Sequence, residues 1–129
     1  MPMLDTNVLL RWILNDVPEQ TASAEKLLTS GTSCIVPDIA LLETVYVLER
    51  VMRLSRATIA QSIETLLSVA DLELDRALWL TALKSYFTHP KLSIADTYLA
   101  ALAQKTNRLP LYTFDHKLAN QLEPAELLR

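Results

Sequence analysis

Glycine and cysteine are nearly missing from this sequence, which has one residue of each. The single cysteine, Cys34, cannot form an internal disulfide, and it leaves no cysteine-rich metal site. With Gly31 as the only glycine, most turns must be made by Asp, Asn, Pro and Ser. The longest apolar run is Tyr98–Ala103, far short of the roughly 20 residues that span a bilayer. We therefore expect neither a disulfide scaffold nor a membrane protein.

A surplus of positive charge is also missing, because 12 basic and 15 acidic side chains give a net charge of −3. This balance argues against a strongly basic nucleic-acid binder, although bound divalent cations would reverse the sign locally. The basic flank of a secretory signal is missing before Asp5, and we expect a cytoplasmic protein. At 129 residues, half of them apolar, the chain fits one domain, residues 1–129, with a real core.

Short apolar segments bounded by turn residues predict strands, and the stretches between them predict helices. The predicted strands are Met3–Leu4, Cys34–Val36, Leu72–Leu74 and Leu111–Thr113. Three predicted helices have definite bounds: Thr6–Leu14, Gln20–Leu28 and Ile94–Lys105, the last of which Ser93 opens. Three more begin at the candidate N-caps Asp38, Ser55 and Asp75, and Asp115 opens a short last helical turn. This alternation predicts an α/β fold with three layers, α/β/α, around a central parallel sheet of about four to five strands.

Four acidic residues lie where such a sheet would gather side chains. Asp5 and Asp115 directly follow predicted strands, and Glu43 lies early in the helix after the second strand. The helix that feeds a fourth parallel strand must begin at the carboxyl edge, and Asp96 is in its first turn. Because open parallel sheets bind ligands at the carboxyl ends of their strands, we expect all four acids to converge on one rim.

Crowded carboxylates repel one another, and a hard divalent cation relieves that repulsion. Oxygen ligands suit Mg²⁺ and Mn²⁺, whereas zinc sites use histidine and cysteine, of which only His116 lies near the acids in sequence. One or two such ions can deprotonate a water molecule and clamp phosphate oxygens. The pattern therefore predicts metal-dependent hydrolysis of a phosphodiester.

Each acid also has a purely structural interpretation. Asp5 and Asp115 would cap the helices that follow them. Asp96 would close a capping box with Ser93. Glu43 would be a solvated helix residue, although apolar residues share its face. Their common edge, rather than any one of them, is what favours a functional site.

The other polar and aromatic side chains carry weaker hypotheses. Three basic residues near the predicted rim would either hold phosphates or form part of a solvated face: Arg11, Arg50 and Lys117. Four aromatic residues at helical spacing are predicted to pack in the interior rather than to stack on bases: Trp12, Tyr46, Trp79 and Tyr98.

Four short motifs, in this order, resemble those of PIN domains: Asp5-Thr6-Asn7, Leu41-Leu42-Glu43, Ser93-Ile94-Ala95-Asp96 and Thr113-Phe114-Asp115. The likeness is strongest to the VapC-type toxins of prokaryotic toxin–antitoxin pairs, and it extends from Met3 to about Leu122. It implies a ribonuclease in which the four acids hold one or two Mg²⁺ or Mn²⁺ ions. Asn7 and Thr113 would support the site through hydrogen bonds. The resemblance also implies an RNA substrate, a homodimer and a small antitoxin that covers the active site.

Rival functions fit the residues less well. A phosphatase of the haloacid-dehalogenase type needs a second Asp two residues after the first, where this chain has Asn7. A receiver domain expects an acidic cluster before its phosphorylated Asp, and a Lys after a late strand where Asp115 stands. A PIN-like module that binds RNA or a protein partner without cutting it stays open as the alternative.

Overall fold

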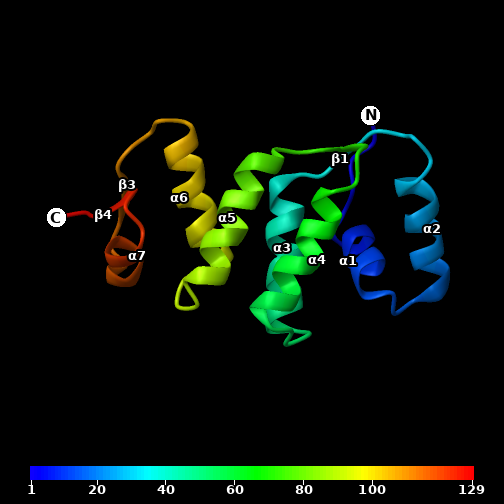
Figure 1. Ribbon diagram of the computed structural model, residues 1–129, viewed down its shortest axis with the longest axis horizontal. Helices are drawn as coiled ribbons and strands as arrows, with labels where there is room; N and C mark the ends of the chain where they lie inside the picture. Colours follow the sequence, from blue (N-terminus) through cyan, green and yellow to red (C-terminus); the bar gives the residue numbers. More distant parts are fainter. The chain divides into compact units, whose positions relative to one another are not determined.

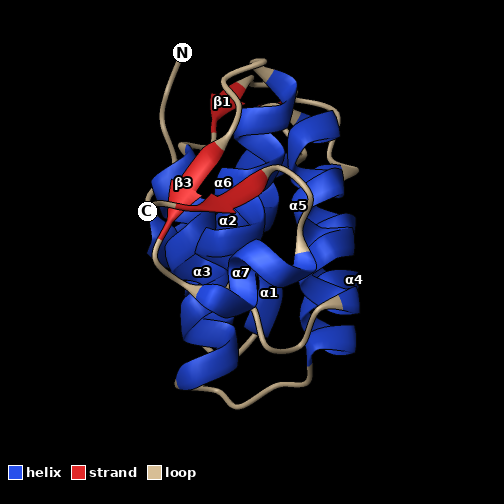
Figure 2. Cartoon of the chain, turned by 90° about the vertical axis from the view of Figure 1, so that its left-hand side faces the viewer, coloured by secondary structure: helices blue, strands red, loops and turns tan.

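Seven helices account for most of the chain, and each begins close to the residue from which the sequence predicts it (Figure 1). The computed structural model describes all residues, Met1–Arg129. They form two compact units, Met1–Leu74 and Asp75–Arg129, each with its own helices and its own pair of parallel strands. Figure 2 shows β1 (Cys34–Ile35), β3 (Leu111–Thr113) and β4 (Ala125–Leu127) as short arrows among the helices. None of the helices has the length and apolar character needed to cross a membrane.

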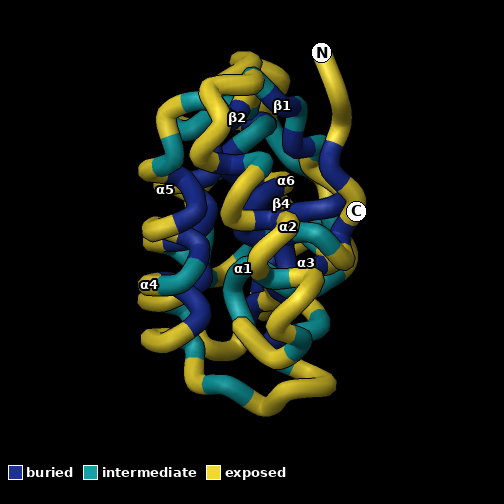
Figure 3. Tube along the Cα trace, turned by 90° about the vertical axis from the view of Figure 1, so that its right-hand side faces the viewer, coloured by how far each residue is buried: buried dark blue, intermediate teal, exposed yellow.

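The first unit combines four helices with two short strands. These are α1 (Thr6–Leu14), α2 (Pro18–Leu28), β1 (Cys34–Ile35), α3 (Asp38–Arg50), α4 (Arg56–Leu67) and β2 (Leu72–Glu73). α1 packs against α2 and α3, and α3 packs against α4. The inward side chains of these helices are apolar and fully buried, among them Leu9, Leu41, Val45 and Ile63. In Figure 3 buried and exposed stretches alternate along α4, as expected of a helix with one face in the core.

Three chain segments of the first unit run parallel to one another and end beside the starts of helices. In the β1–β2 pair, Cys34 lies opposite Leu72. Met3 joins β1 through a single parallel bridge to Ile35, and the Leu4 amide donates to the Ile35 carbonyl at 2.9 Å. Since α1 follows Leu4 and α3 follows β1 almost at once, the first turns of both helices lie at the carboxyl ends of these segments.

The second unit is a helix hairpin joined to a small strand–helix–strand motif. Its elements are α5 (Arg76–Thr88), α6 (Ile94–Lys105), β3 (Leu111–Thr113), α7 (His116–Gln121) and β4 (Ala125–Leu127). α5 and α6 pack closely, and the buried rings of Trp79 and Tyr98 meet edge to face with centroids 4.8 Å apart. β3 and β4 are parallel, with Leu111 opposite Ala125. Their inner face packs with Leu118 in a small apolar cluster.

The helix predictions hold closely. α1 and α6 have the predicted bounds, and Ser55, Asp75, Ser93 and Asp115 cap their helices as predicted. α2 begins two residues earlier than predicted, at Pro18, because the fixed φ of proline and its missing N–H suit the first turn of a helix. Asp38 is the first residue of α3 rather than its cap, a position that Pro37 takes.

The strand predictions hold in part. The α/β class and the parallel direction are confirmed, but the structure has two two-stranded sheets, and the predicted count of four to five strands in one sheet is not confirmed. Met3 contributes only the isolated bridge. β4 was not predicted, because a three-residue segment with Glu126 at its centre shows no apolar run.

Candidate active site

Asp5 occupies the junction between the N-terminal extended segment and α1. The buried Leu4 anchors the extended segment, and Asp5 is the N-cap of α1 with an extended backbone. Its Oδ1 accepts a hydrogen bond from the Thr6 amide at 2.9 Å. The side chain is exposed, so the cap fixes a carboxylate that solvent and ligands can still reach.

Glu43 faces the same hollow as Asp5. The two acids line one pocket of about 450 Å³ between the N-terminal segment and the first turns of α3; its other lining residues are Met3, Leu4, Thr6, Pro37, Ile39 and Ala40. Glu43 is exposed, as are its neighbours Ile39 and Tyr46 on the outer face of α3. The structure thus brings together the two acids that the first unit contributes, at the edge where the sequence predicts them.

Asp96 lies in the first turn of α6 and completes a capping box. The Asp96 amide donates to Ser93 Oγ at 3.1 Å, and the Ser93 amide donates to Asp96 Oδ2 at 3.2 Å. The side chain is half-buried. The structural interpretation of Asp96 is therefore correct, and one carboxylate oxygen remains outside the box.

Asp115 is the N-cap of α7. Its Oδ1 accepts from the Lys117 amide at 2.9 Å and from the Leu118 amide at 3.4 Å. Thr113, predicted to support the site, accepts a hydrogen bond from the Asp115 amide through its Oγ1 at 3.0 Å. The hydroxyl of Thr113 therefore holds the backbone of Asp115, while the Lys117 and Leu118 amides orient its carboxylate.

Asn7, the other predicted supporting residue, lies on the exposed surface of α1. It lines a groove of about 450 Å³ between α1 and α2, together with Arg11, Gln20 and Ser23. This groove is separate from the pocket that Asp5 and Glu43 share.

The four acids divide evenly between the two units. Asp5 and Glu43 belong to the first, and Asp96 and Asp115 to the second. Within neither unit do three or more His, Cys, Asp or Glu side chains gather at a distance suited to a metal ion. The meeting of all four carboxylates therefore stays a prediction of the sequence.

The candidate acids lack partners of opposite charge in the protein. The ion pairs of the structure involve other carboxylates, those of Asp16, Glu49 and Asp75. Asp75 shows what such a partner does, because its hydrogen bond with the Lys105 ammonium, aided by the Leu78 amide, lowers the pKa of its carboxyl below 3.8. Since Asp5 and Glu43 lie in one pocket without such a cation, their negative charge suits an added one.

The donor chemistry of the candidate acids fits a hard divalent ion. Each of the three aspartates uses one carboxylate oxygen in its helix cap: Oδ1 in Asp5, Oδ2 in Asp96 and Oδ1 in Asp115. The second oxygen of each, and both oxygens of Glu43, remain available as ligands of the kind that Mg²⁺ and Mn²⁺ prefer. Capping a helix and binding a metal are therefore compatible roles for the same side chain.

The basic residues named from the sequence differ in their surroundings. Arg11 pairs with Asp16 at 3.1 Å, and its buried Nε has no hydrogen-bond partner. The Arg50 guanidinium lies 5.9 Å from the centre of the Tyr46 ring. Lys117 is exposed two residues after the Asp115 cap, and of these three basic residues it is the nearest in sequence to a candidate acid.

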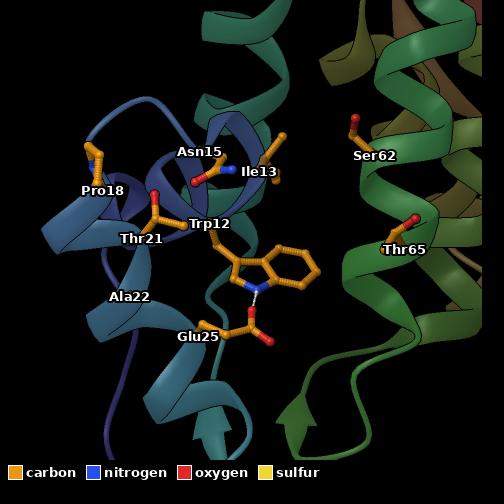
Figure 4. Close-up of a pocket in the computed structure, with 9 residues that line it drawn as sticks. All are labelled: Trp12, Ile13, Asn15, Pro18, Thr21, Ala22, Glu25, Ser62 and Thr65. Atoms are coloured by element: carbon orange, nitrogen blue, oxygen red, sulfur yellow. Dashed lines mark hydrogen bonds between the residues drawn. The ribbon is translucent and has the colours of Figure 1, made fainter.

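The aromatic predictions hold for the second unit and fail in part for the first. Trp79 and Tyr98 are buried, but Tyr46 is 57% exposed, because α3 turns a different apolar stripe to the core. Trp12 is half-buried at the wall of a pocket of about 600 Å³ between α1, α2 and α4. Figure 4 shows its indole extending from α1 toward α4, with Nε1 donating to Glu25 Oε2 at 2.6 Å. Helical spacing alone did not indicate this pocket.

Comparison with known proteins adds one family. The family model for the PIN domain matches residues 3–121, almost the whole chain and all four candidate acids. PIN domains are in general nucleases, and those nucleases usually use divalent metals. A search of the curated proteins finds no match. Because the matched region extends across both units of the structure, the chain belongs to the PIN-domain family.

Proposed function

We propose that this chain is a Mg²⁺- or Mn²⁺-dependent endoribonuclease that hydrolyses RNA phosphodiester bonds. Asp5, Glu43, Asp96 and Asp115 are its metal-binding and catalytic set, acting together in one domain over residues 1–129. The observation that carries the proposal is the pocket shared by Asp5 and Glu43, two carboxylates without a cationic partner. Membership of a nuclease family supports the same conclusion.

The protein's own part in the reaction is to hold carboxylate oxygens in place. When bound, one or two divalent ions supply Lewis acidity for water activation and for the charge on the leaving oxygen. The Thr6 amide, the capping box of Ser93 and the first amides of α7 orient the three aspartates before any ion binds. A ligand set ordered in this way loses little conformational freedom on binding, which favours tight binding of the ion.

The biological role that we propose is that of the toxin in a type II toxin–antitoxin pair. The motif pattern around Asp5 and Asp115 resembles that of the VapC-type toxins, and a small protein antitoxin and a homodimer go with that role. The alternative is a PIN-like module that binds RNA or a protein partner without cutting it. All four acids of the motif pattern are present, which favours the catalytic role.

Metal-dependent cleavage of RNA distinguishes the ribonuclease from a module that binds without cutting. We expect the purified chain to cut single-stranded RNA with Mg²⁺ or Mn²⁺, to lose that activity when EDTA is added, and to regain it when the ion is restored in excess. The physical reason is that the four carboxylates repel an RNA phosphate until a cation neutralises them. Cleavage products are followed on denaturing gels. Cleavage that persists in EDTA would contradict the proposal. The proposal would also fail if the chain bound RNA but cut it with neither Mg²⁺ nor Mn²⁺.

A further inference from the structure

Two aromatic side chains of the second unit lie exposed on the strand that leads to Asp115. Tyr112 in β3 is 57% exposed, and Phe114, directly after β3, is 75% exposed. The alternate residues Leu111 and Thr113 are half-buried, and Leu111 packs on the cluster of Leu92, Leu118 and Ala125. β3 therefore turns Leu111 and Thr113 toward the interior, while Tyr112 and the residue that follows the strand, Phe114, remain at the surface.

The aromatic pair is continuous with the candidate active site. The chain passes from Phe114 directly to Asp115, and the next two residues, His116 and Lys117, are exposed. On the neighbouring strand Glu126 lies opposite Tyr112. At the Phe114 end, the ammonium of Lys117 and a cation held by Asp115, as the proposed function requires, would attract an RNA phosphate. The Glu126 carboxylate beside Tyr112 would repel it.

The spacing of Tyr112 and Phe114 along the extended backbone suits a single strand of RNA whose bases are not stacked on each other. Two residues of a β-strand rise about 6.6 Å, about twice the roughly 3.4 Å rise per nucleotide of a stacked strand. Unpaired bases of RNA are characteristically splayed out and stacked on exposed aromatic side chains. In a continuous stack, neighbouring bases would lie too close together for each to contact its own aromatic ring.

We propose that Tyr112 and Phe114 form a base-stacking platform for single-stranded RNA, which leads the phosphodiester backbone toward Asp115. The inference rests on the proposed function for its substrate class and extends it by naming the residues that hold the flanking bases. Phe114 contributes more than Tyr112, because it is more exposed, adjoins Asp115 and lies farther along the chain from the Glu126 pairing.

The test measures binding rather than cleavage. A short single-stranded RNA carries a fluorescent purine analogue whose emission is quenched on stacking, and the full chain carries Asp96→Asn so that the RNA stays intact. With Mg²⁺ present, Phe114→Ala is expected to weaken binding between about fivefold and a hundredfold and to remove the quenching. Tyr112→Ala should have a smaller effect in the same direction.

Three further variants make the result specific to stacking. Phe114→Trp should retain affinity and quenching, whereas Phe114→Leu, apolar but not aromatic, should lose both. Phe87 on α5 is a matched control, because it is 53% exposed and adjoins no candidate acid in the sequence. Phe87→Ala should bind RNA as the parent does.

Failure of the platform and failure of the nuclease assignment are distinguishable. A chain that never cuts RNA, yet loses affinity and quenching with Phe114→Ala, retains the platform and refutes the nuclease. Unchanged affinity in Phe114→Ala overturns the platform, whether or not the chain cuts RNA. The platform is also overturned if Phe114→Leu binds RNA as the parent does, or if Phe114→Ala changes only the oligomeric state in sedimentation.

Discussion

Asp96→Asn is expected to reduce cleavage of single-stranded RNA about a thousandfold, which corresponds to roughly 4 kcal/mol of transition-state stabilisation. Asparagine keeps an oxygen that can accept from the Ser93 amide, so the capping box and α6 should persist. What the substitution removes is the negative charge that binds the ion. It therefore separates the two roles of this side chain, and initial rates of cleavage at saturating Mg²⁺ measure the loss.

Asp75→Asn is the matched control for that experiment. Asp75 also caps a helix in the second unit, with its Oδ1 accepting from the Leu78 amide at 3.1 Å, but it pairs with Lys105 and lies outside the candidate set. We expect its cleavage rate to match that of the unsubstituted chain. Circular dichroism should show both variants folded. Full activity in Asp96→Asn would show that Asp96 is not part of the active site. An equal loss of activity in Asp75→Asn would show that loss of a charged helix cap, rather than of a metal ligand, explains the lower cleavage rate.

Trp79→Ala is expected to lower the free energy of unfolding by about 3–5 kcal/mol, the usual cost of deleting a buried Trp side chain. Trp79 is fully buried in the α5–α6 hairpin, and its ring meets that of Tyr98 edge to face. The hairpin positions the first turn of α6, where Asp96 lies. Urea denaturation followed by circular dichroism measures the change.

The neighbouring Leu80 provides the control, because it lies on the same helix and is 47% exposed. Leu80→Ala should change the free energy of unfolding by less than about 0.5 kcal/mol, as is usual for surface substitutions. A domain has about 5–15 kcal/mol of stability in all, so Trp79→Phe serves as a milder variant if Trp79→Ala does not fold. If Trp79→Ala lowered the free energy of unfolding by less than about 1 kcal/mol, Trp79 would not be buried between α5 and α6 as described.

The helices could be predicted because local chemistry marks their ends. Ser93 and Asp96 satisfy each other's backbone amides within four residues of chain, and α6 begins and ends at the predicted residues. Asp5 and Asn15 mark α1 in the same way: the first caps the start, and the second ends the helix in a left-handed conformation with φ of 51°. Signals of this kind need no knowledge of the rest of the fold.

The strands and the exposed face of α3 could not be predicted as well, because both depend on distant partners. β4 has three residues and is defined by its pairing with β3, which no local pattern of its sequence records. α3 carries apolar residues on more than one side, and packing, not periodicity, selects Leu41 and Val45 for the core and leaves Tyr46 at the surface. Propensity and pattern describe one segment at a time.

The candidate site shows the same division between local and long-range information. The caps of Asp5, Asp96 and Asp115 follow from their immediate neighbours, and the sequence predicts them as structural alternatives. The shared pocket of Asp5 and Glu43 follows from the parallel alignment of two neighbouring segments, as the predicted strands imply. The exposure of Phe114 was not predicted, since an aromatic residue in an apolar segment normally indicates packing.

Titration of Mn²⁺ into the full chain, followed by calorimetry, tests most directly whether the four carboxylates form one metal site. We predict that the unsubstituted chain binds Mn²⁺, and that each of Asp5→Asn, Glu43→Gln, Asp96→Asn and Asp115→Asn weakens binding at least about tenfold, or roughly 1.4 kcal/mol, while Asp75→Asn does not. A different result would contradict a single site made by all four acids. In that result the substitutions in one unit abolish Mn²⁺ binding, and those in the other unit leave the affinity unchanged.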